Sequence, residues 1–221
     1  MPALETPNGS VPLLEFRLRL AGREWSVLHT EPILTHADEQ RYLNERDTRP
    51  PYGVALWPAA IALAHEIGAR ADTMRGASVL ELGAGTGLPG IVAASFGARV
   101  AQTDRNELVL SVCRMNGARN AVAGVDYRLA DWADWHDAAR YDWILGADVL
   151  YSDAAHSHLR QIFETNLAPG GRVLLADPFR AVSLRLLESL EGDGWRVSLA
   201  KWSVGETRRP RAIGLFELTP P

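Results

Sequence analysis

Val79 to Gly90 reads VLELGAGTGLPG, and this stretch decides the fold of the chain. The apolar run from Ser78 to Leu82 predicts a short buried strand, because the glycines that follow it end the run abruptly. The small residues from Gly90 to Phe96 predict a helix directly afterwards. A glycine-rich turn between a strand and a helix lets a ligand approach the backbone closely at the helix N-terminus. The stretch therefore predicts a cofactor site at the carboxyl edge of a parallel sheet.

Two glycine patterns overlap in this turn and favour different cofactors. Glu81 to Gly87 reads E-x-G-x-G-x-G, which suits S-adenosylmethionine, whereas Gly85 to Gly90 reads G-x-G-x-x-G, the dinucleotide fingerprint. Asp104 lies about 20 residues downstream and suits both cofactors, since both carry ribose hydroxyls that a carboxylate can bind. The glycines and this acid alone leave the choice open.

Three other features favour S-adenosylmethionine. Glu81 precedes the first glycine, and a carboxylate there suits an ammonium and a sulfonium; a pyrophosphate about 5 Å away would be repelled by roughly 3 kcal/mol at an effective dielectric of 20. Asp131 and Trp132 follow a predicted strand, where an acid can bind the adenine amino group and an aromatic ring can pack on the base. Finally, the last two predicted strands have no helix between them, which a plain dinucleotide fold does not need. An oxidoreductase that uses GTGLPG remains the alternative.

Outward from the turn, strand patterns alternate with helical ones. We expect further strands at residues 99–103, 125–129, 143–147, 172–176, 195–203 and 213–218, and helices at 58–70, 106–120, 153–167 and 181–191. This alternation predicts an α/β fold, a Rossmann-like seven-stranded and mostly parallel sheet with helices on both faces. Because the last two strands lack a crossover helix, we expect them to pair as an antiparallel hairpin at one edge. The strand at 172–176 is expected to be entered through a turn at Pro169-Gly170-Gly171.

The first 55 residues are expected to form an N-terminal extension to a single domain at 56–221. Residues 1–12 are rich in proline, glycine and polar residues and predict a loose tail. Residues 14–29 alternate between apolar and polar on either side of Ala21-Gly22, which predicts a β-hairpin. Residues 36–53 predict a loop or a short helix. Pro58 fits the first position of the next helix, where its missing N–H costs nothing.

Composition bounds the kind of protein. With 47% hydrophobic and 23% charged residues, the chain resembles an ordinary soluble globular protein. A formal net charge of -4 argues against non-specific binding of nucleic acid or anionic membrane. No basic-then-apolar leader opens the chain, and no apolar run approaches the roughly 18 residues of a membrane span, so we expect a cytoplasmic protein and a monomer.

The ligating residue types give little sign of a metal. Cys113 is the only cysteine and lies in an apolar-periodic segment, which predicts a buried structural thiol and excludes a disulfide framework. His156 and His158 are two residues apart and therefore face different sides of a helix. The other histidines have no partners at ligand spacing, so we expect no metal site.

Several motifs together resemble a seven-β-strand, Rossmann-like S-adenosylmethionine-dependent methyltransferase. They are ELGAGTG at 81–87, Asp104, the pair Asp131-Trp132, and DVLY at 148–151. Leu56-Trp57-Pro58 before the glycine loop and D-x-x-Y after the fourth strand of the domain narrow the resemblance to the lysine methyltransferase group called family 16. ADPFR at 176–180 is similar to the branch that contains the electron-transfer-flavoprotein β-subunit lysine methyltransferase. The resemblance runs from about Phe16 to Leu218.

The resemblance implies an N-methyltransferase that acts on a lysine of a protein and releases S-adenosylhomocysteine. Members of the group differ in substrate, so a small-molecule amine or another metabolite stays an alternative acceptor. A catalytically silent cofactor-binding module is a third hypothesis, which the presence of Glu81, Asp104 and Asp148 argues against.

The expected site has a cofactor half and an acceptor half. The three alternating glycines are expected to lie under the methionine moiety, Glu81 to bind its amino-acid end or to act only structurally, and Asp104 to hold the ribose diol. By resemblance, Trp57 closes over the methionine moiety, Asp148 lies at the mouth for the substrate amine, and Tyr151 packs beside it. The expected cofactor-binding residues are Trp57, Glu81, Gly83, Ala84, Gly85, Gly87, Asp104, Arg105, Asp131, Trp132 and Ala147; the expected catalytic residues are Asp148 and Tyr151.

Methyl transfer from a sulfonium is an in-line displacement that needs a positioned, neutral nucleophile. A lysine with an unperturbed pKa near 10.4 is neutral in only about one molecule in 2,500 at pH 7. Ionised Asp148 would attract the incoming ammonium but would also raise its pKa, while the sulfonium acts in the opposite direction. We hypothesise that Asp148 recruits and orients the amine, and that the proton leaves to water before the transfer.

Overall fold

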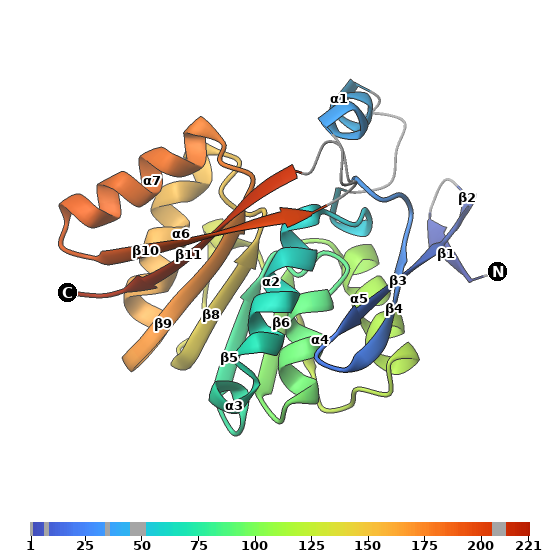
Figure 1. The fold of residues 1–221 in the computed structure, drawn as a ribbon, viewed down its shortest axis with the longest axis horizontal. Helices are drawn as coiled ribbons and strands as arrows, with labels where there is room; N and C mark the ends of the chain where they lie inside the picture. Colours follow the sequence, from blue (N-terminus) through green and yellow to red (C-terminus); the bar gives the residue numbers. More distant parts are fainter. Residues whose placement is uncertain (1, 7–8, 34–35, 45–51, 205–210) are drawn as a thin grey trace.

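The computed structural model describes residues 2–6, 9–33, 36–44, 52–204 and 211–221. Its centre is a seven-stranded sheet in the order β10-β11-β9-β8-β5-β6-β7 (Figure 1). The strands are β5 (Ser78–Leu82), β6 (Arg99–Asp104), β7 (Asp126–Leu129), β8 (Tyr141–Ala147), β9 (Leu167–Asp177), β10 (Arg196–Val204) and β11 (Arg211–Thr219). Strands β5 to β9 pair in parallel, which confirms the predicted Rossmann-like sheet.

The last two strands form an antiparallel hairpin at one edge of the sheet, as the sequence predicts. Strand β11 pairs antiparallel with both β10 and β9, so β10 is the outermost strand on that side. The burial patterns agree with this order, because β11 is mostly buried whereas β10 is mostly exposed. Strand β9 is longer than expected. It takes in Pro169-Gly170-Gly171 through a shift of register against β8 between Tyr141 and Trp143.

Helices cover both faces of the sheet (Figure 1). They are α2 (Pro58–Ala69), α3 (Ala71–Met74), α4 (Leu88–Ser95), α5 (Glu107–Arg119), α6 (Asp153–Asn166) and α7 (Ala181–Gly192), with a 3-10 turn η3 at Trp132–Asp134. One large apolar core lies between the sheet and α2 and α4, and a second lies between the sheet and α6 and α7. The two cores fix β5 and β8 in the middle of the sheet, and both strands lead into the site described below.

The N-terminal extension is more ordered than the sequence suggests. Strands β1 (Ala3–Thr6) and β2 (Gly9–Pro12) form a hairpin where a loose tail was expected. That expectation was wrong because Leu4 and Leu13 are buried in a small apolar cluster with residues of α5. The second hairpin, β3 (Leu14–Leu20) with β4 (Arg23–His29), has the register that the alternation predicts.

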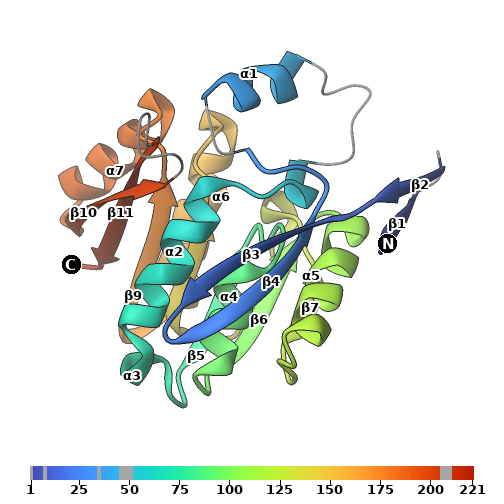
Figure 2. The same ribbon diagram turned by 45° about the vertical axis from the view of Figure 1, so that its right-hand side comes forward.

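The β3–β4 hairpin lies across the helices on one face of the sheet (Figure 2). Asn116 of α5 joins it to that layer, since its side chain accepts a hydrogen bond from the Leu28 amide at 2.7 Å and donates one to the Leu28 carbonyl at 3.0 Å. Asn120 holds Ser26 in the same way. These hydrogen bonds join backbone groups of β4 to side chains of α5 and the residue that follows it, so the hairpin packs against the helical layer.

The segment between the hairpin and α2 carries two short helices, α1 (His36–Asn44) and η2 (Tyr52–Val54). The prediction of a loop or short helix over 36–53 is therefore confirmed for the described part, while residues 45–51 lie outside the described residues. Figure 2 shows α1 beyond the end of the sheet, apart from both helical layers. Among the described residues, no helix reaches the length and apolarity of a membrane span. The division into two parts at residue 55 stays a prediction.

Candidate active site

The glycine loop connects β5 to α4, as the sequence predicts, and its backbone conformation favours glycine at three positions. Gly83, Gly85 and Gly87 all have positive φ, at 59°, 58° and 78°. A side chain in this left-handed region costs roughly 1–2 kcal/mol, so each position favours glycine on conformational grounds. Space adds a second reason at Gly83, because a Cβ there would lie 3.1 Å from Val149 and 3.2 Å from the Trp132 ring.

A buried layer under the loop supports it from below. The Gln102 amide donates to the Gly87 carbonyl at 2.8 Å and also to the Glu81 carboxyl. The Cys113 thiol donates to the Gly85 carbonyl at 2.9 Å, and the Asn116 side chain donates to the Thr86 carbonyl at 2.8 Å. Cys113 is buried, as expected of a structural thiol, and burial raises its pKa well above the ordinary value. The loop is therefore held through its carbonyl oxygens.

Glu81 belongs to the same buried layer. Its side chain accepts a hydrogen bond from the Gly90 amide at the start of α4, at 3.1 Å, and the residue is only 1% exposed. A Cβ at Gly90 would lie 2.4 Å from the same carboxyl oxygen, so Gly90 serves close packing of helix on strand. Desolvation raises the pKa of Glu81 to about 8, despite the hydrogen bonds from Gln102 and Gly90. A bound cation would stabilise the ionised form of this buried carboxyl group, whereas a bound anion would destabilise it.

Asp104 ends the neighbouring strand β6, at the side of the glycine loop. Its two carboxylate oxygens accept hydrogen bonds from the Gly85 amide at 3.3 Å and the Asn106 amide at 3.1 Å. The Ala84 amide donates to the Thr103 carbonyl at 2.9 Å, which ties the loop to the same strand end. Burial raises the pKa of Asp104, although these amide bonds act against the rise. The structure thus places Asp104, the residue predicted to bind the ribose, next to the predicted glycine loop.

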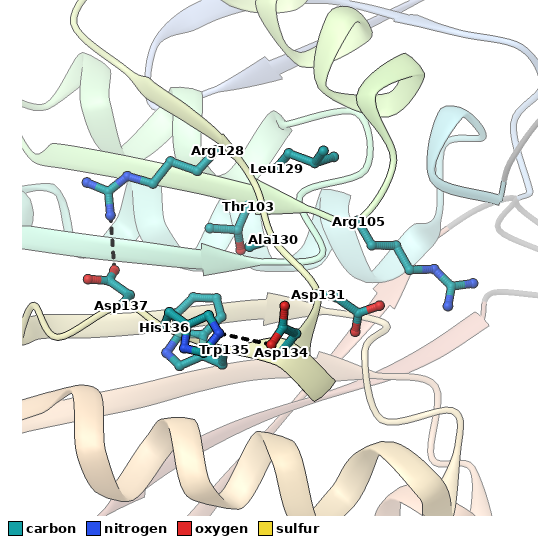
Figure 3. Close-up of a pocket in the computed structure, with 10 residues that line it drawn as sticks. All are labelled: Thr103, Arg105, Arg128, Leu129, Ala130, Asp131, Asp134, Trp135, His136 and Asp137. Atoms are coloured by element: carbon teal, nitrogen blue, oxygen red, sulfur yellow. Dashed lines mark hydrogen bonds and ion pairs between the residues drawn. The ribbon is translucent and has the colours of Figure 1, made fainter.

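Asp131, one of the two residues expected at the adenine, lines a cavity of about 540 Å³ beyond the end of β7 (Figure 3). Its walls are Thr103, Arg105, Arg128, Leu129, Ala130, Asp131, Asp134, Trp135, His136 and Asp137. Asp131 accepts a hydrogen bond from the Ala133 amide at 3.0 Å and begins the η3 turn. Trp132 does not line this cavity; its ring lies near Gly83 and packs against the core that α6 and α7 share with the sheet.

Trp57 ends the segment that leads from η2 to α2. It is the N-cap residue of α2 in an extended conformation, with Pro58 as the first helical residue. Its side chain is half-buried and packs against Ile33 and Ala55. A Cβ at Gly85 would lie 3.3 Å from the Gly53 carbonyl, so this segment is close to the glycine loop at Gly53.

The acceptor half is built on the loop that follows β8. Ala147 ends β8 and pairs with Ala176 of β9, and the Asp148 amide then donates to the Ala176 carbonyl at 2.8 Å. Asp148 has a φ of 60°, an uncommon conformation for a residue other than glycine. Its side chain is only 8% exposed, and its carboxylate accepts a hydrogen bond from Arg180 of the ADPFR segment. Asp148 is therefore fixed in a strained position with a cationic partner.

Arg180 makes further ion pairs around Asp148. Its guanidinium lies 3.3 Å from Asp177 and 2.9 Å from Glu39 of α1, and Arg211 of β11 pairs with the other oxygen of Glu39. Asp177 is fully buried and also accepts hydrogen bonds from the Arg180 amide and the Ser183 hydroxyl. Five charged residues from four separate segments thus form one network at the expected substrate mouth.

Tyr151 lies at the opening of this half and is 54% exposed. Partial desolvation raises the pKa of its hydroxyl. The charges of Arg105, Asp104, Asp148 and Asp131 also act on the pKa of that hydroxyl. The glycine loop, Asp104 and Asp148 lie at the carboxyl ends of the parallel strands β5, β6 and β8, so the structure brings these predicted site residues to one end of the sheet.

Sequence reasoning missed the residues that support the site. Gln102, Cys113 and Asn116 hold the glycine loop from below, and the sequence offers only their place on buried faces of β6 and α5 as a signal. Asp177 and Arg180 belong to ADPFR, a motif used for the resemblance but not assigned a contact. Glu39 could not have been found, because its partners are more than a hundred residues away in the chain.

The site fits S-adenosylmethionine better than a dinucleotide on its own chemistry. The buried Glu81 beside the loop would be stabilised by the positive charges of the first cofactor and destabilised by a pyrophosphate. Within the described ranges, no three His, Cys, Asp or Glu side chains gather as a metal site would require. The expected absence of a metal stays a prediction.

Comparison with known proteins gives related sequences. A family model described as lysine methyltransferase matches residues 37–184. The protein N-lysine methyltransferase METTL21A of Xenopus tropicalis is 40% identical over 118 residues, which are 50% of this chain and 54% of that relative. The histone-arginine methyltransferase METTL23 of Xenopus laevis is 38% identical over 106 residues, 45% of each chain. The chain thus spans about half the length of these two relatives.

Solved structures give the same fold. The T. thermophilus 16S rRNA N2 G1207 methyltransferase RsmC, in complex with AdoMet and guanosine, matches with a TM-score of 0.62 at 21% identity, over 92% of this chain and 50% of that chain. The strand order with one antiparallel strand next to the edge agrees with a Rossmann-like methyltransferase. The chain therefore belongs to the lysine methyltransferase family, and S-adenosylmethionine is its cofactor, as the E-x-G-x-G-x-G pattern predicts.

Proposed function

We propose that this chain transfers a methyl group from S-adenosylmethionine to the side-chain amine of a lysine in a protein substrate. The observation that carries the proposal is the position of Asp148, a buried carboxylate at the end of the strand next to the one that leads into the glycine loop. Val149 contacts the first glycine of that loop, so the acid and the cofactor loop adjoin. Relatives named protein lysine methyltransferases support the acceptor class.

The cofactor half has a role for each residue. S-adenosylmethionine supplies an electrophilic methyl group when it binds. Gly83, Ala84, Gly85 and Gly87 would pass under its methionine moiety, Asp104 would hold its ribose diol, and Asp131 and Arg105 would border its adenine in the cavity of Figure 3. Glu81 would favour the positive end of the molecule from below, and Trp57 would close over it. Trp132 and Ala147 would form the wall next to the transferred group.

The acceptor half must deliver a neutral amine. Asp148 and Tyr151 would border the entry of the lysine side chain, with Asp148 orienting the nitrogen toward the methyl group. The lysine proton would leave to water before transfer, because an ammonium has no lone pair to attack. Keeping the lysine neutral at pH 7 costs about 4.6 kcal/mol for an unperturbed pKa. A site that methylates lysine must therefore avoid stabilising the ammonium form, a point taken up below.

A specific observation supports a second acceptor. One relative is named a histone-arginine methyltransferase, so an arginine side chain is the next candidate. A small-molecule amine is the third. The cytoplasmic location and the monomeric state expected from the sequence also stay predictions.

One labelling experiment separates these acceptors. The purified chain is incubated with a heat-treated cell lysate and S-adenosylmethionine labelled in its methyl group, with Asp148→Asn as the control variant. Label in a protein band that is recovered after acid hydrolysis as ε-N-methyllysine supports the proposal. Label recovered as methylarginine would move the acceptor to arginine, and label confined to small molecules would contradict a protein substrate.

A further inference from the structure

Arg180 occupies the position where a substrate cation would be expected. It is the residue whose guanidinium bonds the Asp148 carboxylate, and the pair is buried, with 24% of the Arg180 side chain and 8% of the Asp148 side chain exposed. A lysine ammonium that approached Asp148 would therefore meet a carboxylate that already has a positive partner. The simple picture of Asp148 as a free anion that captures an ammonium does not agree with this geometry.

The backbone conformation on both sides of the pair holds Asp148 and Arg180 in position. Asp148 and Phe179 both have positive φ, at 60° and 63°, and a bulky residue in this conformation is a genuine outlier. Such strain persists only where the surrounding structure enforces it, and it concentrates at functional sites. Phe179 is held by edge-to-face packing on Phe216, and the Arg180 amide is held by Asp177 at 2.9 Å. Two strained turns thus present the guanidinium and the carboxylate to each other.

Charged groups from several elements surround the pair. They are Asp177 on the same loop as Arg180, Glu39 on α1 and Arg211 on β11, and the Lys201 Nζ of β10 lies 5.7 Å from the centre of the neighbouring Phe179 ring. Within the ion-pair network itself, three carboxylates face two guanidiniums. Burial lowers the pKa of Arg180, but the surrounding carboxylates raise it by more than burial lowers it. Arg180 therefore remains a cation at any pH of interest.

This arrangement matters for the protonation of the acceptor. An uncompensated carboxylate beside a lysine raises the lysine pKa, and each unit of rise lowers the reactive neutral fraction tenfold. A guanidinium bound to the same carboxylate opposes that effect and leaves the carboxylate able to accept a hydrogen bond from a neutral amine. The pair can orient the nitrogen without holding its proton.

We propose that Arg180 is a positioning residue for methyl transfer, whose guanidinium fixes the Asp148 carboxylate and offsets its charge so that the acceptor lysine reacts as the neutral amine. The inference rests on the proposed lysine acceptor and adds to it how the site treats the charge of that acceptor. Arg180 acts through Asp148 and needs no contact with the substrate.

The first test needs no acceptor. Sinefungin is an analogue of S-adenosylmethionine that carries a primary amine in place of the sulfonium methyl group, and it places an ammonium where the acceptor nitrogen and the methyl meet. The measured quantity is the ratio of its affinity to that of S-adenosylhomocysteine, by calorimetry on the full chain at pH 7. We expect Arg180→Gln to raise this ratio at least tenfold and Asp148→Asn to lower it by a similar factor, with little change in the affinity for S-adenosylhomocysteine.

The double variant makes the charge argument decisive. Removing both charges in Arg180→Gln/Asp148→Asn leaves neither ion buried alone, and the ratio is expected to return to within threefold of the wild-type value. If Arg180→Gln does not fold, the contrast between Asp148→Asn and the double variant carries the same test. Equal ratios in all variants, or changes of the same sign in both single variants, would overturn the proposal. Arg185→Gln is the matched control on α7, since Arg185 pairs with Asp153 at the exposed surface and should leave the ratio unchanged.

The second test uses the acceptor identified by labelling. The alkaline rise of kcat with pH reports the deprotonation of the bound lysine, and Arg180→Gln is expected to move this rise upward by at least one pH unit, while Arg180→Lys keeps it within half a unit. A lower kcat in Arg180→Gln with an unshifted profile would mean a structural role only and would contradict the proposal. Because the sinefungin ratio does not depend on the acceptor, failure of the lysine assignment and failure of this inference give different results.

Discussion

Glu81 and Asp148 are two buried carboxylates at the ends of neighbouring parallel strands, and their surroundings differ sharply. The hydrogen bonds to Glu81 come from the Gly90 amide and the Gln102 side chain, and desolvation raises its pKa to about 8. Asp148 is bonded by the Arg180 guanidinium, which works against the rise that burial causes in its pKa. An incoming positive charge would stabilise ionised Glu81, whereas Asp148 already pairs with the positive charge of Arg180.

This difference fits the two ligands of a methyltransferase. The cofactor carries permanent positive charge, so a buried acid that lacks a bonded cation in the described contacts can contribute to its binding. The acceptor must react as a neutral amine, so an acid at its entry is useful when its charge is offset. On the proposed assignment of the two ligands, the partners of these two carboxyl groups match the charge of the ligand that each would face.

The largest expected effect lies in the acceptor half. Asp148→Asn keeps the shape of the side chain but removes its charge and leaves Arg180 without its closest partner. Because a positioned group that handles a reacting nitrogen contributes about 100- to 10,000-fold, we expect kcat/KM to fall about 1,000-fold across pH 7 to 10. Binding of S-adenosylhomocysteine should change less than threefold. Wild-type kcat/KM over that pH range in the variant would remove Asp148 from the acceptor site and with it the comparison.

The two halves also differ in how far the sequence predicts them. Strand β5 and the helix after it depend on neighbours within a dozen residues, so the apolar run, the glycines and the small residues that follow were sufficient to predict them. The alternation of strands and helices likewise predicted a mostly parallel sheet with a hairpin at one edge, but it did not predict the order of the strands. Local chemistry determines the cofactor half.

The acceptor half depends on contacts between distant segments. Glu39 meets Arg180 and Arg211 across 141 and 172 residues, and nothing in a single sequence indicates which acid pairs with which arginine among 23 basic residues. The β1–β2 hairpin was missed for a similar reason, since Leu4 and Leu13 become ordered only through burial against α5. The position of Asp148 was predicted by resemblance, but its partner required the fold.

The next effect concerns the stability of the cofactor half. Glu81 has a pKa of about 8 when folded and an ordinary value when unfolded, so the folded state holds the extra proton and loses stability as pH rises toward 8. Between pH 6.5 and 8 this amounts to about 2 kcal/mol, and we expect Glu81→Gln to remove that loss. Buried His29, whose pKa burial lowers to about 4, acts in the opposite direction only below its ordinary value of 6.5, so this window avoids it.

The measurement is thermal unfolding of both proteins across that window. A difference of about 2 kcal/mol corresponds to roughly 4–8 °C in a chain of this size. The same measurement at saturating S-adenosylmethionine tests whether the charge of the cofactor acts on Glu81. If the cofactor ammonium acts on Glu81, the wild-type pH slope shrinks when the cofactor is bound; an unchanged slope would leave Glu81 with the structural role alone.

A smaller effect is expected from the backbone of the loop. Gly85→Ala places a side chain at a φ of 58° and a Cβ 3.3 Å from the Gly53 carbonyl, which costs roughly 1–2 kcal/mol. Because the strain is relieved by moving the loop, we expect the affinity for S-adenosylmethionine to fall about tenfold. Gly192→Ala is the matched control at the end of α7, where a Cβ meets nothing within 4 Å and φ is not positive. Equal affinities in both variants would mean that the loop backbone is not part of the cofactor site.

The smallest effect tests the outer edge of the cofactor half. Asp131 lines the cavity of Figure 3 and is exposed, so a hydrogen bond from the adenine amino group to its carboxylate would contribute about 1 kcal/mol. We expect Asp131→Ala to weaken S-adenosylhomocysteine about fivefold by calorimetry, and Asp134→Ala, whose exposed side chain pairs with His136 in the same cavity, to leave it unchanged.

Loss of the bond from Asp131 to the Ala133 amide could also disturb the η3 turn, so affinity alone does not identify the adenine contact. S-inosylhomocysteine, which carries an oxo group in place of the adenine amino group, separates the two causes. Wild type should prefer S-adenosylhomocysteine, and Asp131→Ala should lose that preference because no carboxylate remains to discriminate an amino donor from an oxo acceptor. A preference retained in the variant would place the adenine recognition on another residue of the cavity and limit the role of Asp131 to starting the turn.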